Sequence, residues 1–336
     1  MFIPKISSIN ENHKIEMLLC PDVRGIISKL PSNIKKELEE IRLRVDKPLM
    51  INFDNEDYFV SMDGKVMDGP SGSFIVSKKN IENTLQFITN YSIYSVEEEL
   101  KNGYITVEGG HRVGIVGKVL CSKNDIRSMK DFSGLNIRIS KEKKGVSSSV
   151  LKYLIDNKGE FLNTLIISPP QCGKTTLLRD IIRNLSTGMP SLGFKGKKIG
   201  VVDERSEIGA CFQGVAQNDL GPRTDILDAC PKAVGMMILI RAMSPQIIAT
   251  DEIGRREDSD AIEEALLAGI NLITTVHGKS IEDIIQRKVI GSLIERKIFK
   301  RIIVLSNSKG IGTIEKILDG NTLNEIIGTA IKNKVG

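Results

Sequence analysis

The first half of the chain mixes helical and strand-like patterns of apolar residues. Apolar side chains recur at helical spacing over residues 34–41, directly after a Pro-Ser pair, and again over residues 81–88. This spacing predicts two amphipathic helices. Two apolar runs, residues 104–108 and 112–119, flank Gly109-Gly110, which is typical of a β-hairpin. The first half is therefore expected to be a mixed α/β domain.

A short strand expected at residues 136–139 precedes a polar stretch. Residues 141–145 hold lysines and a glutamate before a glycine, and serines follow at residues 147–149. Charged and small residues without periodicity favour an irregular linker. We therefore expect a smaller α/β N-terminal domain with its linker over residues 1–145, and a second domain over residues 146–336.

Short, continuous apolar runs alternate with helical segments in the second half of the chain. Continuous apolar strands between helices are typical of a parallel sheet covered on both faces. Right-handed crossovers place the carboxyl ends of such strands at one edge of the sheet, where ligands bind. The expected strands cover residues 162–167, 199–202, 247–250, 272–276 and 302–305.

Composition and charge narrow the class of protein without indicating a function. The chain has 336 residues, of which 40% are hydrophobic and 26% charged, as in an ordinary globular protein. Its 47 basic and 42 acidic residues give a net charge of +5, and residues 101–150 hold 10 basic against 4 acidic residues. An excess this small does not require a nucleic-acid partner.

The chain shows no pattern of export, membrane insertion or zinc binding. Its five cysteines are scattered and its histidines number three, so no zinc site is expected and the thiols fit a reducing cytoplasm. Residues 1–19 lack a continuous apolar core, so we expect no signal peptide. The most apolar stretch, residues 233–250, is interrupted by Arg241, Pro245 and Gln246 and is not expected to span a membrane.

The strongest motif follows the first strand of the second half. Residues 168–175 have the form SxxxxGKT of a Walker A phosphate loop, with serine in place of the usual first glycine. Backbone N–H groups of such a loop and the dipole of the following helix bind phosphate oxygens, and Lys174 would lie between the β- and γ-phosphates. The candidates for binding ATP are Ser168, Pro169, Pro170, Gln171, Cys172, Gly173, Lys174, Thr175 and Thr176.

A second motif, of the Walker B type, ends the third strand of this half. Apolar residues 247–249 lead to Thr250, Asp251 and Glu252. The hydroxyl of Thr175 is an expected ligand of Mg²⁺, and Asp251 is expected to hold the ion through a water molecule. Glu252 is the expected base that orients and deprotonates the attacking water. Together the two motifs predict a Mg²⁺-dependent ATP hydrolase with a RecA-like P-loop domain.

Two more strand ends carry polar residues at the same edge. The second strand ends in Asp203-Glu204, which could position water or the ligands of the metal, although carboxylates also cap helices. The fourth ends at His277, which could sense the γ-phosphate by hydrogen bonding, although a histidine at a strand end is often solvated. Asp203, Glu204 and His277 therefore join Glu252 as catalytic candidates.

These motifs and the stretches between them resemble a known family. The matching stretches are SPPQCGKTTLLRD, VVDERSEIGACFQGVAQNDLGPRTDILDACPKA, GMMILIRAMSPQIIATDEIG and TTVHG. The chain resembles the stage III sporulation AA family of endospore-forming bacteria over most of residues 103–310, and that family is similar to type II and type IV secretion ATPases. The resemblance implies an α/β N-terminal domain, a RecA-like motor domain and a homo-hexameric ring.

The resemblance also implies a role for particular residues. It places the Walker A motif at residues 168–175, the acidic box at Asp203 and Glu204, the Walker B motif at Asp251 and Glu252, and the histidine box at His277. Secretion ATPases also direct arginines of the N-terminal domain toward a nucleotide. Arg112 and Arg138 in the basic segment are the candidates here, with Arg223 as a third. The alternative for each is an ordinary surface arginine.

The family's role implies a place and partners for the chain. It would be a cytoplasmic ATPase, peripheral on the inner face of the mother-cell membrane. Membrane proteins of the stage III sporulation complex would recruit it there. It would power or gate a channel that joins the mother cell and the forespore.

Two other functions compete with this interpretation. A nucleic-acid-dependent RecA-like ATPase or single-strand binder is compatible with the fold. Aromatic residues are only 4% with no tryptophan, which leaves few surfaces for base stacking, so no nucleic-acid partner is expected. A nucleotide-gated scaffold would bind ATP and scarcely hydrolyse it. Glu252 disfavours the scaffold because such a protein needs no catalytic base.

Overall fold

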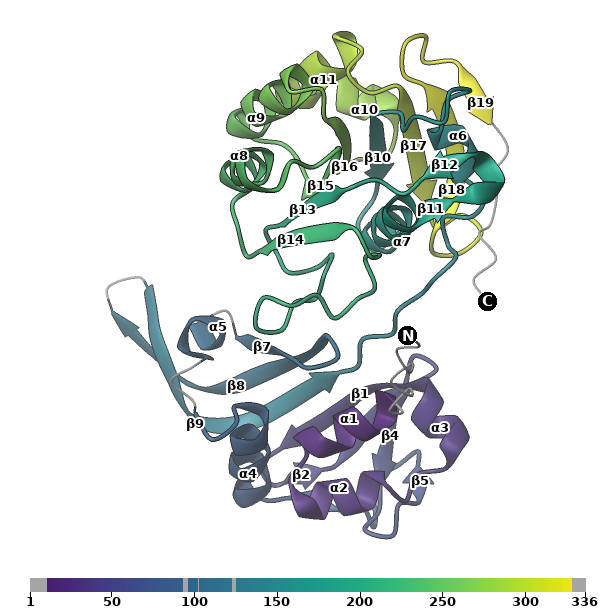
Figure 1. The fold of residues 1–336 in the computed structure, drawn as a ribbon. Helices are drawn as coiled ribbons and strands as arrows, with labels where there is room; N and C mark the ends of the chain where they lie inside the picture. The colour runs from purple at the N-terminus through teal and green to yellow at the C-terminus, as the bar shows by residue number, and fades with distance from the viewer. Residues whose placement is uncertain (1–10, 93–95, 102, 123–124, 328–336) are drawn as a thin grey trace, which may run out of the picture. The chain divides into compact units, whose positions relative to one another are not determined.

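A computed structural model describes residues 11–92, 96–101, 103–122 and 125–327 of the chain. These residues fold into two compact units, which divide between Lys141 and Glu142 (Figure 1). Each unit has its own main sheet; the first unit has one hydrophobic core and the second has two.

The first unit is built on an antiparallel sheet. Its helices are α1 (Glu11–Leu18), α2 (Pro21–Ile27), α3 (Ser32–Glu37), α4 (Lys78–Ile88) and α5 (Glu97–Lys101). Its strands are β1 (Leu38–Arg44), β2 (Lys47–Pro48), β3 (Met50–Phe53), β4 (Glu56–Val60), β5 (Val66–Met67), β6 (Ile75–Val76), β7 (Tyr104–Val107), β8 (His111–Ser122) and β9 (Asp125–Arg138). Seven of them pair in the order β5-β4-β3-β1-β9-β8-β7, and β2 pairs with β6. Buried residues of α1, α2 and α4 share one core with the sheet.

The helix predicted over residues 34–41 is wrong beyond its first half. Helix α3 ends at Glu37, and Leu38 begins the central strand β1. The pairing of β1 with β3 shifts register between Leu38 and Glu40, which marks a bulge that adds one residue to the strand. Leu38 and Ile41, three positions apart, are consequently both buried. The bulge gives this strand the apolar spacing of a helix.

The helix predicted over residues 81–88 and the hairpin at Gly109-Gly110 are confirmed. Helix α4 covers the first of these segments, and β7 pairs antiparallel with β8 across the two glycines. Gly109 and Gly110 have φ angles of 91° and 74°, a conformation that residues with a Cβ rarely adopt. Strand β9 begins at Asp125 and pairs with β8 along most of its length, so it is much longer than the strand predicted at residues 136–139.

The second unit is an eight-stranded sheet with helices on both faces. Its strands are β10 (Thr164–Ser168), β13 (Ile199–Asp203), β14 (Thr224–Asp228), β15 (Ile247–Glu252), β16 (Asn271–His277), β17 (Arg301–Ser306), β18 (Thr313–Asp319) and β19 (Glu325–Ile327), with a small separate pair, β11 (Gly188–Met189) and β12 (Phe194–Lys195). Its helices are α6 (Leu151–Leu154), α7 (Lys174–Thr187), η2 (Pro190–Leu192), α8 (Lys232–Met243), α9 (Arg256–Leu267), α10 (Ile281–Ile285) and α11 (Lys288–Glu295).

The sheet has the strand order β14-β13-β15-β16-β10-β17-β18-β19. The first six strands in this order are parallel, whereas β18 and β19 are antiparallel to their neighbours. All five predicted strands are present, as β10, β13, β15, β16 and β17. Strands β14, β18 and β19 were not predicted.

Alternate residues of the parallel strands lie in two separate cores. Ile166 of β10 packs in one core with α7, whereas Leu165 and Ile167 pack in another with α8, α9 and α11. All three side chains are fully buried. A strand that is buried on both faces shows no alternation of apolar and polar residues, which explains the continuous apolar runs in the sequence.

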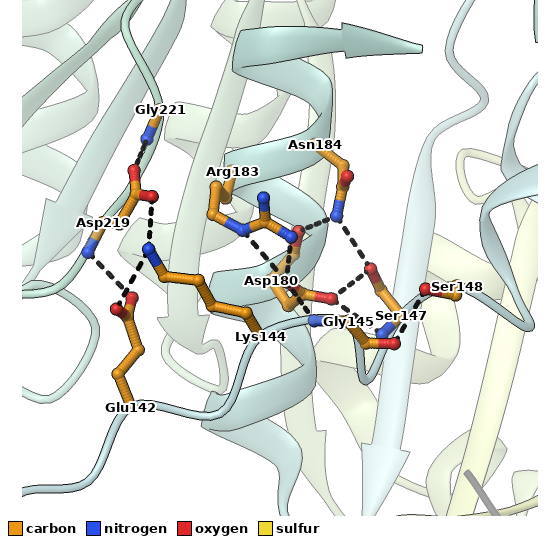
Figure 2. A network of polar contacts seen from close by, with 10 residues as sticks. All are labelled: Glu142, Lys144, Gly145, Ser147, Ser148, Asp180, Arg183, Asn184, Asp219 and Gly221. Atoms are coloured by element: carbon orange, nitrogen blue, oxygen red, sulfur yellow. Dashed lines mark hydrogen bonds and ion pairs between the residues drawn. The ribbon is translucent and has the colours of Figure 1, made fainter. Parts of the chain in front are cut away.

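Residues 142–148, the first segment of the second unit, are anchored on helix α7 (Figure 2). The carboxylate of Asp180 on α7 accepts hydrogen bonds from the backbone N–H groups of Gly145 (3.1 Å) and Ser147 (2.8 Å). It also accepts hydrogen bonds from the hydroxyl of Ser147 and the guanidinium of Arg183, both at 2.6 Å. Burial acts to raise the pKa of Asp180, but these hydrogen bonds outweigh it and hold the pKa below its ordinary value.

The same segment contacts the loop before β14. Lys144 forms ion pairs with Glu142 (3.4 Å) and Asp219 (2.7 Å), and the N–H of Asp219 donates to Glu142 (2.8 Å). The side chains of Lys144 and Asp219 are about half exposed (50% and 46%), so solvent screens their attraction. Asp180 is only 3% exposed and is therefore the main anchor of the segment.

Replacing Asp180 by alanine is expected to destabilise the second unit by about 3 kcal/mol, because Arg183 and two backbone N–H groups lose their acceptor inside the protein. Urea unfolding followed by circular dichroism at pH 7 measures the change. Asp260→Ala, at an exposed position of α9, is the matched control and is expected to change stability by less than about 0.5 kcal/mol. Equal stabilities of the two variants would show that the segment is held by other contacts.

Candidate nucleotide-binding site

The predicted phosphate loop connects β10 to α7. Ser168 ends β10 opposite His277 of β16, and α7 begins at Lys174. Gln171 and Gly173 have φ angles of 59° and 81°, and such left-handed turns bring successive N–H groups together as a site for anions. Ser168 is not in the left-handed region, so a serine fits there without backbone strain.

The connection between β17 and β18 supports the loop. Gly312 donates its N–H to the carbonyl of Cys172 at 3.2 Å, and the side chain of Cys172 is buried. A Cβ added to Gly173 would lie 3.3 Å from Cγ2 of Ile311 and would also be strained by the positive φ. Gly173 is therefore required both by the conformation of the loop and by the space around it.

A cleft of about 280 Å³ lies beside the loop. It gathers residues that lie at, or follow, the carboxyl ends of four parallel strands: β10, β13, β15 and β16. Two of the predicted ATP-binding residues, Ser168 and Cys172, are buried and do not line it. The lining residues are Pro169, Pro170, Gln171, Gly173, Lys174, Thr175, Thr176, Arg205, Glu207, Asp251, Glu252 and His277.

Three of the predicted residues lie close together in this cleft. Nε2 of His277 is 3.4 Å from Nζ of Lys174 and 3.4 Å from Oε2 of Glu252. Burial lowers the pKa of Lys174, although Glu252 and Asp251 act to raise it. The side chains of His277 and Glu252 are 36% and 30% exposed, so both are open to water and to a ligand.

A shift in strand pairing sets the position of the two Walker B carboxylates. The register between β15 and β16 shifts between Ala249 and Glu252, and such irregularities re-aim side chains at the edge of a sheet. The hydroxyl of Thr274 donates to the backbone carbonyl of Asp251 at 2.8 Å. Both carboxylates line the cleft, and Asp251 is the more buried of the two.

A buried lysine joins the acidic residues of the site. Lys232 begins α8, and its ammonium forms ion pairs with Oε2 of Glu204 and, at 3.4 Å, with Oδ1 of Asp251. The hydrogen bond from Lys232 lowers the pKa of Glu204, whereas burial raises the pKa of Asp251 against the effect of Lys232. Burial also acts to lower the pKa of Lys232, but Glu204 and Asp251 raise it above its ordinary value. Lys232 therefore remains a cation between the two carboxylates.

Asp203 orders the loop that follows β13. Its side chain is fully buried and accepts backbone N–H groups of Glu207 (2.9 Å), Ile208 (2.9 Å) and Gly209 (2.8 Å). Asp203 does not line the cleft. These contacts support a structural role, and its catalytic role stays a prediction, as does that of Glu204, which reaches the site through Lys232.

Asp203 is expected to make the stability of the second unit depend on pH. Burial raises its pKa to about 6, although the three N–H groups favour the charged form. An acid whose folded pKa is raised stabilises the protein at low pH, and this contribution, about 3 kcal/mol, is lost as the pH rises from about 4 to about 6. Urea unfolding of Asp203→Asn should lack this loss, with Asp260→Asn as the control. If the free energy of unfolding fell equally steeply with pH in both variants, Asp203 would not be the source of the pH dependence.

The residues present fit a Mg²⁺ ion. Among the described residues, Oδ1 of Asp251 accepts no hydrogen bond, and its ion pair with Lys232 is 3.4 Å long. Thr175 lies in the first turn of α7 and lines the cleft. One carboxylate and one hydroxyl are the protein ligands that Mg²⁺ takes when phosphates supply others.

Arg112 and Arg138 lie in the first unit, opposite each other on the paired strands β8 and β9. The guanidinium of Arg112 lies over the ring of Tyr104, 4.8 Å from its centroid. Nε of Arg138 lies 3.9 Å from Oε1 of Glu40. Contact of either arginine with a nucleotide stays a prediction.

Arg223 precedes β14, and its side chain reaches the C-terminal end of α7. Its guanidinium donates to the carbonyls of Ser186 (2.8 Å) and Thr187 (3.3 Å). A cation at this end of a helix satisfies free carbonyls and complements the helix dipole. Because the phosphate loop is at the opposite end of the same helix, Arg223 does not line the cleft of its own chain.

Sequence reasoning missed Arg205, Glu207 and Lys232. Arg205 directly follows the predicted strand end at Asp203-Glu204, and that position was its available signal. Lys232 follows Pro231 at the start of a helix, where a cation is unfavourable. That conflict with the helix dipole was the only hint that carboxylates surround the lysine.

The chain matches a known protein family and one of its members. Residues 9–324 match the family described as "Sporulation stage III, protein AA". The chain is 42% identical over 318 residues to stage III sporulation protein AA of Bacillus subtilis strain 168, covering 94% of this chain and 98% of that protein. The chain belongs to the sporulation stage III protein AA family. The predicted family is thereby confirmed.

Solved structures of ATPases share the fold of this sporulation stage III protein AA family member. The ATPase DotB of Yersinia pseudotuberculosis has a TM-score of 0.53 at 13% identity, covering 86% of this chain and 77% of that chain. The pilus retraction motor PilT with bound ADP has a TM-score of 0.51 at 14% identity, covering 81% and 76%. The predicted α/β fold with a RecA-like P-loop domain is confirmed. The part of the chain that the structure describes contains no helix with both the length and the apolar character of a membrane span.

Proposed function

We propose that this chain is a Mg²⁺-dependent ATP hydrolase of the secretion-ATPase type that works in endospore formation. The proposal rests mainly on one observation: a single cleft is lined by the phosphate loop, Asp251, Glu252 and His277. Two further facts support it: the PilT structure of the same fold holds ADP, and the chain belongs to a sporulation family.

Each residue of the cleft has a role in this proposal. The phosphate loop and Lys174 bind the phosphate oxygens of ATP. Glu252 orients a water molecule and accepts its proton. His277, 3.4 Å from both Lys174 and Glu252, donates a hydrogen bond toward the γ-phosphate, and Arg205 adds positive charge to the cleft.

Thr175 and Asp251 would hold Mg²⁺ in this site. When bound, the ion would neutralise negative charge on the phosphate oxygens of ATP. The protein contributes a threonine hydroxyl at the start of α7 and a carboxylate that Thr274 holds in place through its backbone.

We further propose that six copies of the chain assemble into a ring. Arg112 or Arg138 of one copy would then reach the nucleotide bound by another. The ring would act at the cytoplasmic face of the mother-cell membrane, held by membrane proteins of the stage III sporulation complex, and would power or gate their channel. Family membership and the resemblance to secretion ATPases support this proposal.

Phosphate release from ATP, measured per protomer over a wide range of protein concentrations, tests the proposed function. For a self-assembling ATPase, turnover per protomer and the mass of the particle in solution both rise as the protein concentration rises. The double variant Arg112→Ala/Arg138→Ala should still assemble but should hydrolyse ATP more slowly than the wild type. Full turnover by a monomer would contradict the ring, and an assembled protein without any turnover would contradict the ATPase.

A further inference from the structure

A buried positive charge lies among the acidic residues of the site. Lys232 is 8% exposed, and its ammonium contacts Glu204 and Asp251. Glu204 has a second cation nearby, since Nη1 of Arg255 lies 3.8 Å from its Oε1, but Arg255 is 74% exposed. Lys232 is therefore the buried cation of the group, in contact with buried Asp251 and partly exposed Glu204.

The position of Lys232 conflicts with local preferences. It is the first residue of α8, where the helix dipole disfavours a cation. Burial of an ammonium group also costs free energy unless carboxylates compensate it. Glu204 and Asp251 offset both costs, and local rules are typically broken in this way at functional sites.

Asp251 is also the expected metal ligand of the cleft. One of its oxygens, Oδ1, faces Lys232 at 3.4 Å and accepts no hydrogen bond from the described residues. Among these residues, no group of three or more histidines, cysteines, aspartates or glutamates is arranged to hold a metal ion. The protein alone thus offers a divalent cation few ligands, and one of them already faces a positive charge.

We propose that Lys232 is a positioning residue that occupies the acidic pair Glu204 and Asp251 in the nucleotide-free protein, so that divalent metal enters only together with nucleotide. The inference rests on the proposed function in taking Asp251 as a metal ligand. The phosphates of ATP bring the negative charge that allows the ion to compete with Lys232. Metal binding without nucleotide is suppressed because the ion and the ammonium repel each other.

Binding of Mn²⁺ to the full chain without nucleotide tests this role. The electron paramagnetic resonance signal of free Mn²⁺ measures how much of the ion is bound. Wild-type protein should bind Mn²⁺ weakly, and Lys232→Met should bind it at least about tenfold more tightly, because the two carboxylates lose their internal cation. Lys232→Arg keeps the charge and should bind as weakly as the wild type.

Further variants separate this role from a structural one. Arg255→Met removes the exposed cation near Glu204 and should leave Mn²⁺ binding within about twofold of the wild type. The double variant Lys232→Met/Glu204→Gln removes one charge of each sign and should lose the gain in binding. A merely structural lysine would produce loss of folding and no gain of affinity.

Several results would overturn the proposal. One is tight Mn²⁺ binding by the nucleotide-free wild type, which is decisive even if Lys232→Met fails to fold. Others are a folded Lys232→Met without increased affinity, and a Lys232→Arg that binds like the methionine variant. Because these measurements use neither ATP nor turnover, an inactive protein that gives the expected Mn²⁺ results would contradict only the proposed ATPase function.

Discussion

Replacing Glu252 by glutamine is expected to reduce ATP turnover by about 10²- to 10⁴-fold. Glutamine keeps the size and the hydrogen bonding of the side chain but cannot accept the proton of the attacking water. The affinity for ATP should change little, because binding depends on the phosphate loop. Phosphate release measures turnover, and equilibrium binding of a fluorescent ATP analogue measures affinity.

Glu264→Gln is the matched control for this prediction. Glu264 lies at an exposed position on α9, so its replacement removes the same charge without touching the cleft. If Glu252→Gln retained most of the turnover of this control, Glu252 would not be the base. The scaffold alternative would then regain support, since a protein that only binds ATP does not need this carboxylate.

Lys174→Ala is expected to weaken ATP binding by about 100-fold, which corresponds to about 3 kcal/mol. The variant removes the cation that contacts the phosphates, whereas the backbone N–H groups of the loop remain. Turnover at low ATP concentration should fall at least as much. The binding assay used for Glu252→Gln measures the affinity.

Lys158→Ala removes a lysine at an exposed position in the same unit and controls for the change in net charge. Thermal unfolding of both variants without nucleotide establishes that each is folded. Equal ATP affinity in Lys174→Ala and Lys158→Ala would exclude the phosphate loop as the nucleotide site.

The parallel strands of the second unit could be predicted because their environment is uniform. Leu165, Ile166 and Ile167 are all buried between helices on two faces, so the three middle positions of β10 form a continuous apolar run. Strand β14 escaped prediction because it lies at the edge of the sheet, and all its residues are only partly buried. Because Asp225 and Asp228 interrupt it, β14 has no continuous apolar run that would predict a strand.

The first unit was harder to predict because its sheet contains irregular pairings. The bulge at Leu38–Glu40 placed Leu38 and Ile41 on one face at a spacing that also describes a helix. Only the tertiary context, in which β1 lies between β3 and β9, decides between the two. Short-range apolar spacing does not contain that information.

The candidate site shows the same division between local and tertiary information. Asp251, Glu252 and His277 could be predicted because they end strands whose carboxyl ends lie at the ligand edge, and Lys174 because it belongs to the phosphate-loop motif that follows β10. Lys232 could not, because its role depends on contacts with Glu204, which follows β13, and with Asp251 of β15. Arg112 and Arg138 need a second copy of the chain to act as proposed, and their role remains a prediction.

Single-turnover hydrolysis of ATP, with protein in excess over nucleotide in the presence of Mg²⁺, tests the central claim most directly. Under these conditions the rate reports cleavage of the γ-phosphate and is independent of product release. The account predicts that the wild type converts bound ATP to ADP and phosphate, while Glu252→Gln binds ATP and leaves it intact. Equal rates for the two proteins, or bound ATP that stays intact in the assembled wild type, would contradict it.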